Sequence, residues 1–511
     1  MNKTMLNLSI LVEESARRNP EKPALSLGET TINYRIFHEK VCQAANAFTK
    51  KGIGYGDKVA LLCPNIPQFP IIFFAILKTG ATVVPFSIFL KPEEIAYQLS
   101  DSDSTLFLCF AGTPEMPVGQ FGKEGFVQSG SCRDFISIGH LAEDILNFDD
   151  LIKDEETDFE SYMTSSEDTA VIIYTSGTTG RPKGAELSHI NLFTNAEAST
   201  TIVGAAEFEA QLVVLPLFHI FGLTVMLLAG IRKSLHLILL PKFSAQSVYQ
   251  LITRFDIRIF AGVPSMYWVL LNEEDTEENT HSIKKLRICI SGGASLPVKI
   301  IDEFETRFEV PIIEGYGMSE GSPVVTFNQL AVGRKPGSIG TPIWGVEVKI
   351  VDDQGNELPV GEKGELIYRG PNVMKAYYKR HQETEEVLKN GWMFSGDIAV
   401  KDEDGFFFIV DRKKEVIIRG GMNVYPREVE EVMMRNPDIS MVAIIGIDDE
   451  KLGEEIKAFV VRTKESKASE EDITLWIKER IAKYKYPRII EFIDELPLSA
   501  TGKILKKNLK N

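Results

Sequence analysis

Cysteine is scarce in this sequence, and its few copies lie far apart. The 511 residues contain five, Cys42, Cys63, Cys109, Cys132 and Cys289, with no CxxC pair and no Cys/His spacing that would hold zinc. The pattern argues against a zinc site and against a disulfide framework. We therefore expect a reducing compartment, the cytoplasm.

An excess of positive charge is also missing. Asp and Glu outnumber Lys and Arg by 72 to 56, which gives a formal net charge of −16. Such a chain repels a phosphate backbone, and no stripe of Lys and Arg interleaved with aromatic residues is present, so we expect no nucleic-acid partner. A small anionic ligand remains compatible, because a few local donors are enough to hold it.

No segment has the pattern of a signal peptide or of an uninterrupted membrane span. Glu13 directly follows a short apolar stretch, which favours an amphipathic first helix over a signal peptide. Residues 212–231 are apolar and about long enough to cross a bilayer, but Pro216, His219 and Gly222 interrupt them. A strand, a turn and a helix explain these breaks, so we expect no transmembrane segment.

Length and composition predict a globular chain with more than one domain. Hydrophobic residues make up 44% of the sequence and charged residues 25%, close to the average of globular proteins. A chain of 511 residues is too long for one ordinary domain. We expect a large body and a smaller second unit.

Apolar runs repeatedly lead into helical patterns in the first part of the chain. They are KVALLC then FPIIFFAILK, TVVPF then PEEIAYQL, AVIIYTSG then HINLFTNAEA, and RICISGGASLP then VKIIDEFETRF. The alternation predicts an α/β fold built from parallel βαβ units. In open α/β sheets ligands bind beyond the carboxyl ends of the strands, where these Gly-rich turns fall.

The predicted secondary-structure pattern changes twice toward the C-terminus. From Val346, hairpins with Gly and Asp turns predict a β-rich part over 346–410, which ends an N-terminal body of residues 1–410. Residues 411–511 then alternate helix and strand again, as a small α+β domain. This domain has 20 Lys and Arg against 19 Asp and Glu, a net charge of +1, whereas the body carries −17. The asymmetry supports the boundary.

The strongest local signal is the run YTSGTTGRPKGAELSH. An apolar strand opens there into Thr175, Ser176, Gly177, Thr178, Thr179, Gly180 and Lys183. Glycines let backbone N–H groups turn inward, hydroxyls add donors and a lysine supplies a point charge, so the loop suits phosphate. The spacing is not that of a Walker loop. The structural alternative is a polar surface loop.

This run resembles the signature of the adenylate-forming superfamily of acyl-CoA synthetases, peptide adenylation domains and beetle luciferases. Later runs resemble the remaining motifs of that superfamily, in order. They are PLFHIFG around His219, SGGASLP from Ser291, EGYGMSE from Glu314, SGDIA around Asp397, DRKKEVIIRGG from Asp411 and LSATGKILKK around Lys503. Ordered motifs over more than 300 residues are specific, whereas GYG or GG alone would be weak.

The resemblance implies a binding site for ATP and AMP. Tyr316 would stack on adenine, and Asp397 would accept hydrogen bonds from the ribose hydroxyls with Arg412 nearby. By themselves these residues could equally be a core tyrosine and a turn aspartate. The other residues implied are Gly293, Ala294 and Gly315, which leave room for the base, and Ser295, Glu314, Gly317, Met318 and Ser319.

The resemblance also assigns the charged groups that act on phosphate. Glu320 looks like the carboxylate that holds Mg²⁺ on the ATP phosphates, although alone it would pass for a solvated acid. Lys183 and Lys503 would neutralise the charge that develops when a carboxylate attacks the α-phosphate. His219 resembles the histidine that lines the passage between the acid and adenylate sites, and its alternative is a packed core residue.

Two half-reactions are implied. The carboxylic acid first forms an acyl-adenylate with ATP, and the thiol of coenzyme A then displaces AMP. The family rotates its small C-terminal domain between the two steps. Here the hinge would be Lys414, and the loop with Gly420 and Gly421 would swing in beside the CoA channel.

The last motif ends in several lysines. Lys503 follows Gly502 in a turn that can present one side chain to the body. We expect the later ones, Lys506, Lys507 and Lys510, to continue in a polar tail.

The acid itself is less well defined. The run GWMFSGDIAVKDEDGFFFIVDRKKEVIIRGG looks closest to medium- and long-chain fatty acyl-CoA synthetases, so a fatty acid is the leading substrate. The alternatives are an aryl or small acid, a carrier protein in place of CoA, or a non-catalytic nucleotide-binding protein that has kept the fold. We leave a homodimer open.

Overall fold

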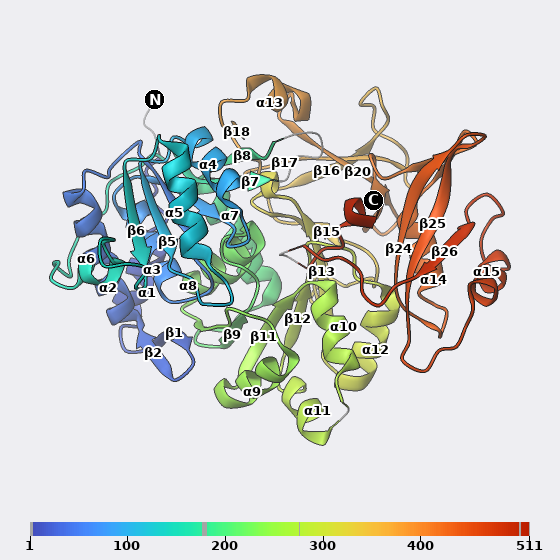
Figure 1. Cartoon of the computed structure of the whole chain (residues 1–511), viewed down its shortest axis with the longest axis horizontal. Helices are drawn as coiled ribbons and strands as arrows, with labels where there is room; N and C mark the ends of the chain where they lie inside the picture. The colour runs from blue at the N-terminus through green and yellow to red at the C-terminus, as the bar shows by residue number, and fades with distance from the viewer. Residues whose placement is uncertain (1–3, 176–180, 275, 500–501, 510–511) are drawn as a thin grey trace.

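The computed structural model describes residues 4–175, 181–274, 276–499 and 502–509. Within them one mixed sheet carries most of the N-terminal strands (Figure 1). Its order is β18 (Ala376–Tyr377), β8 (Lys183–Ser188), β7 (Thr169–Thr175), β4 (Thr82–Phe86), β3 (Lys58–Leu62), β5 (Leu106–Phe110) and β6 (Asp134–Ile138). The strands from β7 to β6 are parallel, whereas β8 and β18 are antiparallel to their neighbours.

A second, larger sheet carries the middle of the chain. Its order is β15 (Thr341–Pro342), β14 (Val324–Phe327), β13 (Ile312–Gly317), β12 (Ile288–Ser291), β11 (Ile257–Gly262), β9 (Ala210–Val213), β10 (His236–Leu239), β1 (Pro23–Leu27) and β2 (Thr30–Asn33). The strands from β13 to β1 are parallel to each other. The prediction of an α/β fold with parallel βαβ units is confirmed.

Helices connect these strands. In chain order they are α1 (Ile10–Arg18), α2 (Tyr34–Lys50), α3 (Gln68–Lys78), α4 (Pro92–Asp101), α5 (Val118–Ser129), α6 (Phe148–Ile152), α7 (His189–Val203), the π-helix η1 (Gly222–Leu228), α8 (Ala229–Arg232), α9 (Ala245–Phe255), α10 (Pro264–Asn272), α11 (Glu277–Ile283), α12 (Val298–Phe308), the 3₁₀ turn η2 (Ser319–Gly321) and α13 (His381–Val387). Helix α9 shows why the sequence folds this way, since its buried residues Ala245, Val248, Tyr249 and Ile252 recur at helical spacing. The side chain of Ser244 caps its first turn.

A third, antiparallel sheet follows the larger one in the chain. It contains β16 (Glu347–Val351), β17 (Gly364–Arg369), β20 (Trp392–Lys401) and β19 (Leu388–Lys389), with β21 (Phe407–Arg412) beside β20. The register of β20 and β21 sets Asp397 opposite Arg412. The boundary predicted after Val410 falls inside β21, and the division into 1–410 and 411–511 stays a prediction.

The C-terminal part has its own sheet and buried clusters, at the right of Figure 1. Its strands are β23 (Met422–Val424), β22 (Ile417–Arg419), β25 (Gly453–Arg462), β24 (Ile439–Asp449) and β26 (Ile489–Phe492), and its helices are α14 (Pro426–Met433), α15 (Glu470–Lys478) and the 3₁₀ turn η3 (Lys506–Leu509). The largest of its clusters runs from Ile417 to Ile490. A separate core lets this part fold around its own strands.

Some local predictions of helices and turns are confirmed, and one is wrong. The amphipathic first helix is confirmed as α1, and 212–231 do contain a strand end, a turn and a helix. The crossover expected between AVIIYTSG and HINLFTNAEA is wrong, because β8 returns antiparallel to β7 before α7 begins. Among the described residues, no helix combines the length and the apolar character needed to cross a membrane.

Candidate functional site

Asp397 is the centre of a buried polar cluster. Its side chain lies on β20, and the residue is 3% exposed. The Tyr316 hydroxyl, from β13, donates to Oδ2 at 2.5 Å, and Arg412 Nε lies 3.1 Å from Oδ1. Burial raises the pKa of Asp397, while the Arg412 charge and the Tyr316 hydrogen bond pull it down without cancelling that effect. A carboxylate can accept hydrogen bonds from the ribose hydroxyls, and an aromatic ring beside it can stack on the base.

Glu320 forms a second part of the site, on η2. It is 6% exposed, and burial raises its pKa. Tyr377 of β18 donates its hydroxyl to Glu320 Oε1 at 2.6 Å. A lone buried carboxylate fits Mg²⁺, which is commonly held by one or two carboxylates together with phosphate oxygens and water. The described residues contain no group of three or more His, Cys, Asp or Glu that could hold a metal without such outside ligands.

Tyr377 also connects Glu320 to the predicted phosphate loop. The Nζ of Lys183 lies 5.3 Å from the centroid of the Tyr377 ring, within cation–π distance. Sequence reasoning missed Tyr377, whose only signal is a Tyr–Tyr pair in a stretch without a motif. Its position comes from the antiparallel pairing of β18 with β8.

The predicted loop closes the hairpin of β7 and β8. Thr175 ends β7 and pairs with Lys183, the first residue of β8. Ser176, Gly177, Thr178, Thr179 and Gly180 lie outside the described residues, so their predicted contacts with phosphate remain predictions.

The glycines of the adenine motifs have different surroundings. Gly293 adopts a φ of +80° in the turn after β12, a conformation that favours glycine, and Ala294 and Ser295 follow it toward α12. A Cβ on Gly315 would lie 2.3 Å from the ring of Phe327. Packing against Phe327 therefore already explains why residue 315 has no side chain, apart from any room left for a base.

Beyond Tyr316 the backbone turns sharply toward Glu320. A Cβ on Gly317 would lie 1.8 Å from the carbonyl oxygen of Pro323. Met318 donates its N–H to the same carbonyl at 3.1 Å. Ser319 then begins the 3₁₀ turn that carries Glu320. The close backbone approach fixes the path that delivers the carboxylate.

Glu314 is buried on β13 and makes structural contacts. Its Oε2 accepts the N–H of Gly337 at 3.0 Å, and its carbonyl accepts the N–H of Asn328 at 2.9 Å. Burial raises its pKa to about 7, against the opposing influence of the Gly337 N–H and of Arg427. These contacts support the β13 end of the site, while the predicted role of Glu314 toward the nucleotide stays a prediction.

His219 lies in the turn before η1. Its Nδ1 accepts the N–H of Phe221 at 3.3 Å, and burial lowers its pKa to about 4, so the ring is neutral at pH 7. Phe221 packs against Gly292, where a Cβ would lie 3.0 Å from the ring. The segment of His219 thus adjoins the turn that contains Gly293.

The turn that carries Lys503 contacts helix α10 of the body. Its N–H donates to Ser499 Oγ at 3.0 Å, and Ser265 of α10 donates its hydroxyl to the Gly502 carbonyl at 3.3 Å. Burial lowers the pKa of Lys503 and nearby Arg412 lowers it further, against the opposing charges of Glu415 and Asp397. The charges of Arg412 and Asp397 thus act on the Lys503 ammonium across a long sequence separation.

The expected polar tail after Lys503 is wrong for Lys506. The Lys506 side chain is 21% exposed, and its Nζ lies 2.8 Å from Glu430 and 3.7 Å from Glu415. Lys507 is exposed, as expected. Lys510 lies outside the described residues.

The residues predicted for the hinge and the CoA channel follow Arg412 in the chain. Lys414 is exposed in the segment between β21 and β22. Gly420 and Gly421 form the turn of the β22–β23 hairpin with φ of +58° and +79°. Gly420 donates its N–H to the Leu452 carbonyl at 2.8 Å, a contact within the C-terminal part.

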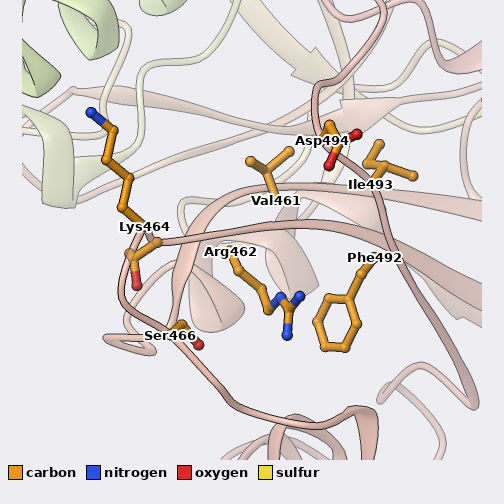
Figure 2. Close-up of a pocket in the computed structure, with 8 residues that line it drawn as sticks. Val461, Arg462, Lys464, Ser466, Phe492, Ile493 and Asp494 are labelled. Carbon is orange, nitrogen blue, oxygen red and sulfur yellow. The ribbon is translucent and has the colours of Figure 1, made fainter.

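A surface cavity of about 620 Å³ lies on the C-terminal part, and none of the predicted site residues that the structure describes lines it (Figure 2). It is lined in part by Arg462, Lys464, Phe492 and Asp494. The Arg462 guanidinium lies 4.4 Å from the centroid of the Phe492 ring, and Figure 2 shows Lys464 extending away from both. Residue chemistry, not cavity size, therefore identifies the candidate site.

Comparison with known proteins gives matches over nearly the whole chain. The model of a family described as AMP-binding enzyme matches residues 12–378, and that of the AMP-binding enzyme C-terminal domain matches residues 428–503. A long-chain-fatty-acid–CoA ligase of Bacillus subtilis (strain 168) is 34% identical, over 99% of this chain and 94% of the relative. A feruloyl-CoA synthase of Amycolatopsis sp is also 34% identical, over 97% of this chain and 96% of the relative. The solved structure of the anthranilate CoA ligase AuaEII in complex with anthranoyl-AMP has a TM-score of 0.92 at 28% identity, covering 99% of this chain and 96% of that one.

Proposed function

This chain belongs to the AMP-binding enzyme family and is an acid:CoA ligase, and we propose that its acid is a medium- or long-chain fatty acid. The observation that carries the chemistry is the cluster in which Asp397 binds Tyr316 and Arg412, with the charge of Lys503 acting on the same carboxylate. Such a cluster offers a nucleoside an aromatic ring and a carboxylate, and offers phosphate two cations.

In the first step the chain's own residues have to bring two anions together. The carboxylate of the acid attacks the α-phosphate of ATP, and pyrophosphate leaves. Arg412 and Lys503 supply fixed positive charge beside Asp397, where no reorganisation is needed as negative charge develops. Mg²⁺, when bound at Glu320, would neutralise phosphate charge, and Tyr377 orients that carboxylate.

In the second step the thiol of CoA attacks the acyl carbonyl and AMP leaves. We place the hinge of this step at Lys414, because it lies in the segment between β21 of the body sheet and β22 of the C-terminal sheet. Rotation there would withdraw Lys503 and bring Gly420 and Gly421 toward the acyl-adenylate. The exposed hairpin turn that carries both glycines is compatible with such a movement.

The choice of acid is supported by the Bacillus subtilis relative, whose name specifies a long-chain fatty acid. The feruloyl-CoA synthase, equally identical to this chain, favours an aryl acid as second candidate. Hydrophobic pockets separate homologous acids by only about 1–3 kcal/mol per methylene. Direct comparison of acids therefore decides between them.

The deciding experiment measures AMP release over a panel of octanoate, palmitate, ferulate, benzoate and malonate, with CoA present and with CoA absent. We expect the highest kcat/KM with octanoate or palmitate. Activity confined to ferulate and benzoate would replace the fatty acid with an aryl acid. Transfer to a holo-carrier protein but not to CoA would show that the acceptor is a carrier.

We also propose a cytoplasmic location, which the five cysteines support because each is buried and unpaired. A homodimer stays a prediction that sedimentation would test.

A further inference from the structure

Lys506 occupies a position that the reaction described above does not use. It begins η3, three residues after Lys503, and Figure 1 shows this C-terminal end beside β24. Its Nζ lies 2.8 Å from Glu430 of α14 and 3.7 Å from Glu415, in the segment that follows β21. One ammonium thus joins the end of the chain to a helix and to the segment beside the proposed hinge.

The anions around Lys506 are themselves held in place. Glu430 Oε1 also accepts the N–H of Ile444 at 2.8 Å. Asp411, on β21, faces Lys506 as well, and its two oxygens accept the N–H groups of Arg412 and Arg427. Burial alone lowers the pKa of Lys506, but Glu430, Asp411 and Glu415 together raise it above its ordinary value. Lys506 is therefore a fixed positive charge.

Glu415 faces both lysines. It lies 3.7 Å from the Lys506 ammonium and raises the pKa of Lys503. An ammonium has no directional preference of its own and follows the nearest negative charge. Without Lys506, the carboxylate of Glu415 would compete with substrate for Lys503.

We propose that Lys506 is a positioning residue for Lys503. Its ion pairs with Glu430 and Glu415 fix the end of the Lys503 turn and neutralise Glu415, so that the Lys503 ammonium stays directed at the reacting carboxylate and phosphate. The inference rests on the proposed function, because it requires Lys503 to act in adenylation.

A purely structural Lys506 would behave differently. A residue that only tethers the chain end would, when replaced, lower the melting temperature and weaken both half-reactions together. A residue that directs Lys503 affects the adenylation step alone, since the proposed rotation withdraws Lys503 before CoA reacts.

The test uses the full chain with the best acid of the panel. Lys506→Ala, Lys506→Met and Lys506→Arg are compared with wild type, and Lys507→Ala is the control because Lys507 is exposed on the same turn. Pyrophosphate release without CoA reports adenylation, conversion of supplied acyl-AMP and CoA reports the thioester step, and thermal melting reports folding. Lys506→Met retains the aliphatic stem and takes the place of the alanine variant should that one fail to fold.

We expect Lys506→Ala and Lys506→Met to lower the kcat of adenylation by about 10-fold or more, because small misplacements of a catalytic group have large effects. The thioester step should stay within about twofold of wild type, and Lys506→Arg, which keeps the charge, should recover adenylation to within about threefold. Adenylation at the wild-type rate in Lys506→Met, or equal loss of both steps in a folded variant, would overturn the inference. If wild type itself forms no acyl-AMP with any acid, the proposed function fails instead.

Discussion

Replacing Lys503 with alanine should slow adenylation by about 100-fold and leave the thioester step near its wild-type rate. The Lys503 ammonium interacts electrostatically with Arg412 and with the buried carboxylate of Asp397. Alanine removes one of two cations there, while Arg412 remains. A preorganised charge in a shielded site contributes about 2.7–4 kcal/mol to the transition state. Because Arg412 supplies part of the same field, the lower figure applies, and about 2.7 kcal/mol corresponds to a factor of 100.

The assay separates the two half-reactions. Acid and ATP without CoA give the adenylation rate from pyrophosphate release, and supplied acyl-AMP with CoA gives the thioester rate. Lys507→Ala is the matched control, because Lys507 is exposed whereas Lys506 is ion-paired with Glu430. If Lys503→Ala adenylates normally, or loses both steps equally while it remains folded, the proposed rotation that withdraws Lys503 between the two steps is wrong.

Four further predictions concern the other parts of the site. Glu320→Ala should weaken use of Mg·ATP far more than it lowers the melting temperature, since we propose that this carboxylate holds the metal; normal AMP formation at low Mg²⁺ would contradict this. Tyr377→Phe removes a hydrogen bond to a charged group, which is worth about 1.5–3 kcal/mol, and should raise the KM for Mg·ATP about 10-fold; an unchanged Mg²⁺ titration would show that Tyr377 does not orient Glu320. Lys414→Pro fixes φ at the proposed hinge, so adenylation should remain measurable while the thioester step collapses; equal loss of both steps in a folded variant would remove the hinge from Lys414. The proposed role of Lys503 in adenylation requires its protonated form. Burial and Arg412 lower the pKa of Lys503, so the rate should fall as pH rises through a value below that of an ordinary lysine; in Lys506→Met the fall should move to higher pH, because the Lys506 charge also lowers the pKa of Lys503.

The parallel sheets were largely predictable because strands such as β4 are buried on both faces. Runs such as TVVPF are fully buried in β4, so their apolar character is continuous and easily recognised. The run KGAELS mixes polar and apolar residues, and its antiparallel return as β8 is decided by pairing with β7 and β18, which no local pattern encodes.

The same distinction applies to the site. Tyr316, Asp397, Arg412 and Lys503 could be proposed from the sequence because each lies in a recognisable motif. The structure pairs Tyr316 and Arg412 with Asp397, and the roles of all four toward the nucleotide stay predictions. Tyr377 could not be predicted because its contact with Glu320 spans 57 positions. The contact depends on the pairing of the edge strand β18 with β8.

The ion pairs of Lys506 could not be predicted for a related reason. A lysine in a basic tail has the composition of a solvated surface, and only the folded chain shows Glu430 and Glu415 beside it. Composition and periodicity alone do not predict ion pairs between distant segments.

Transfer of an oxygen isotope tests whether the acid is activated as an acyl-adenylate before CoA reacts. The acid is supplied with both carboxylate oxygens as ¹⁸O, together with ATP and CoA, and the products are examined by mass spectrometry. Attack of the carboxylate on the α-phosphate followed by loss of AMP predicts one ¹⁸O atom in AMP and one in the thioester. Unlabelled AMP, or ADP formed with label in inorganic phosphate, would contradict the account.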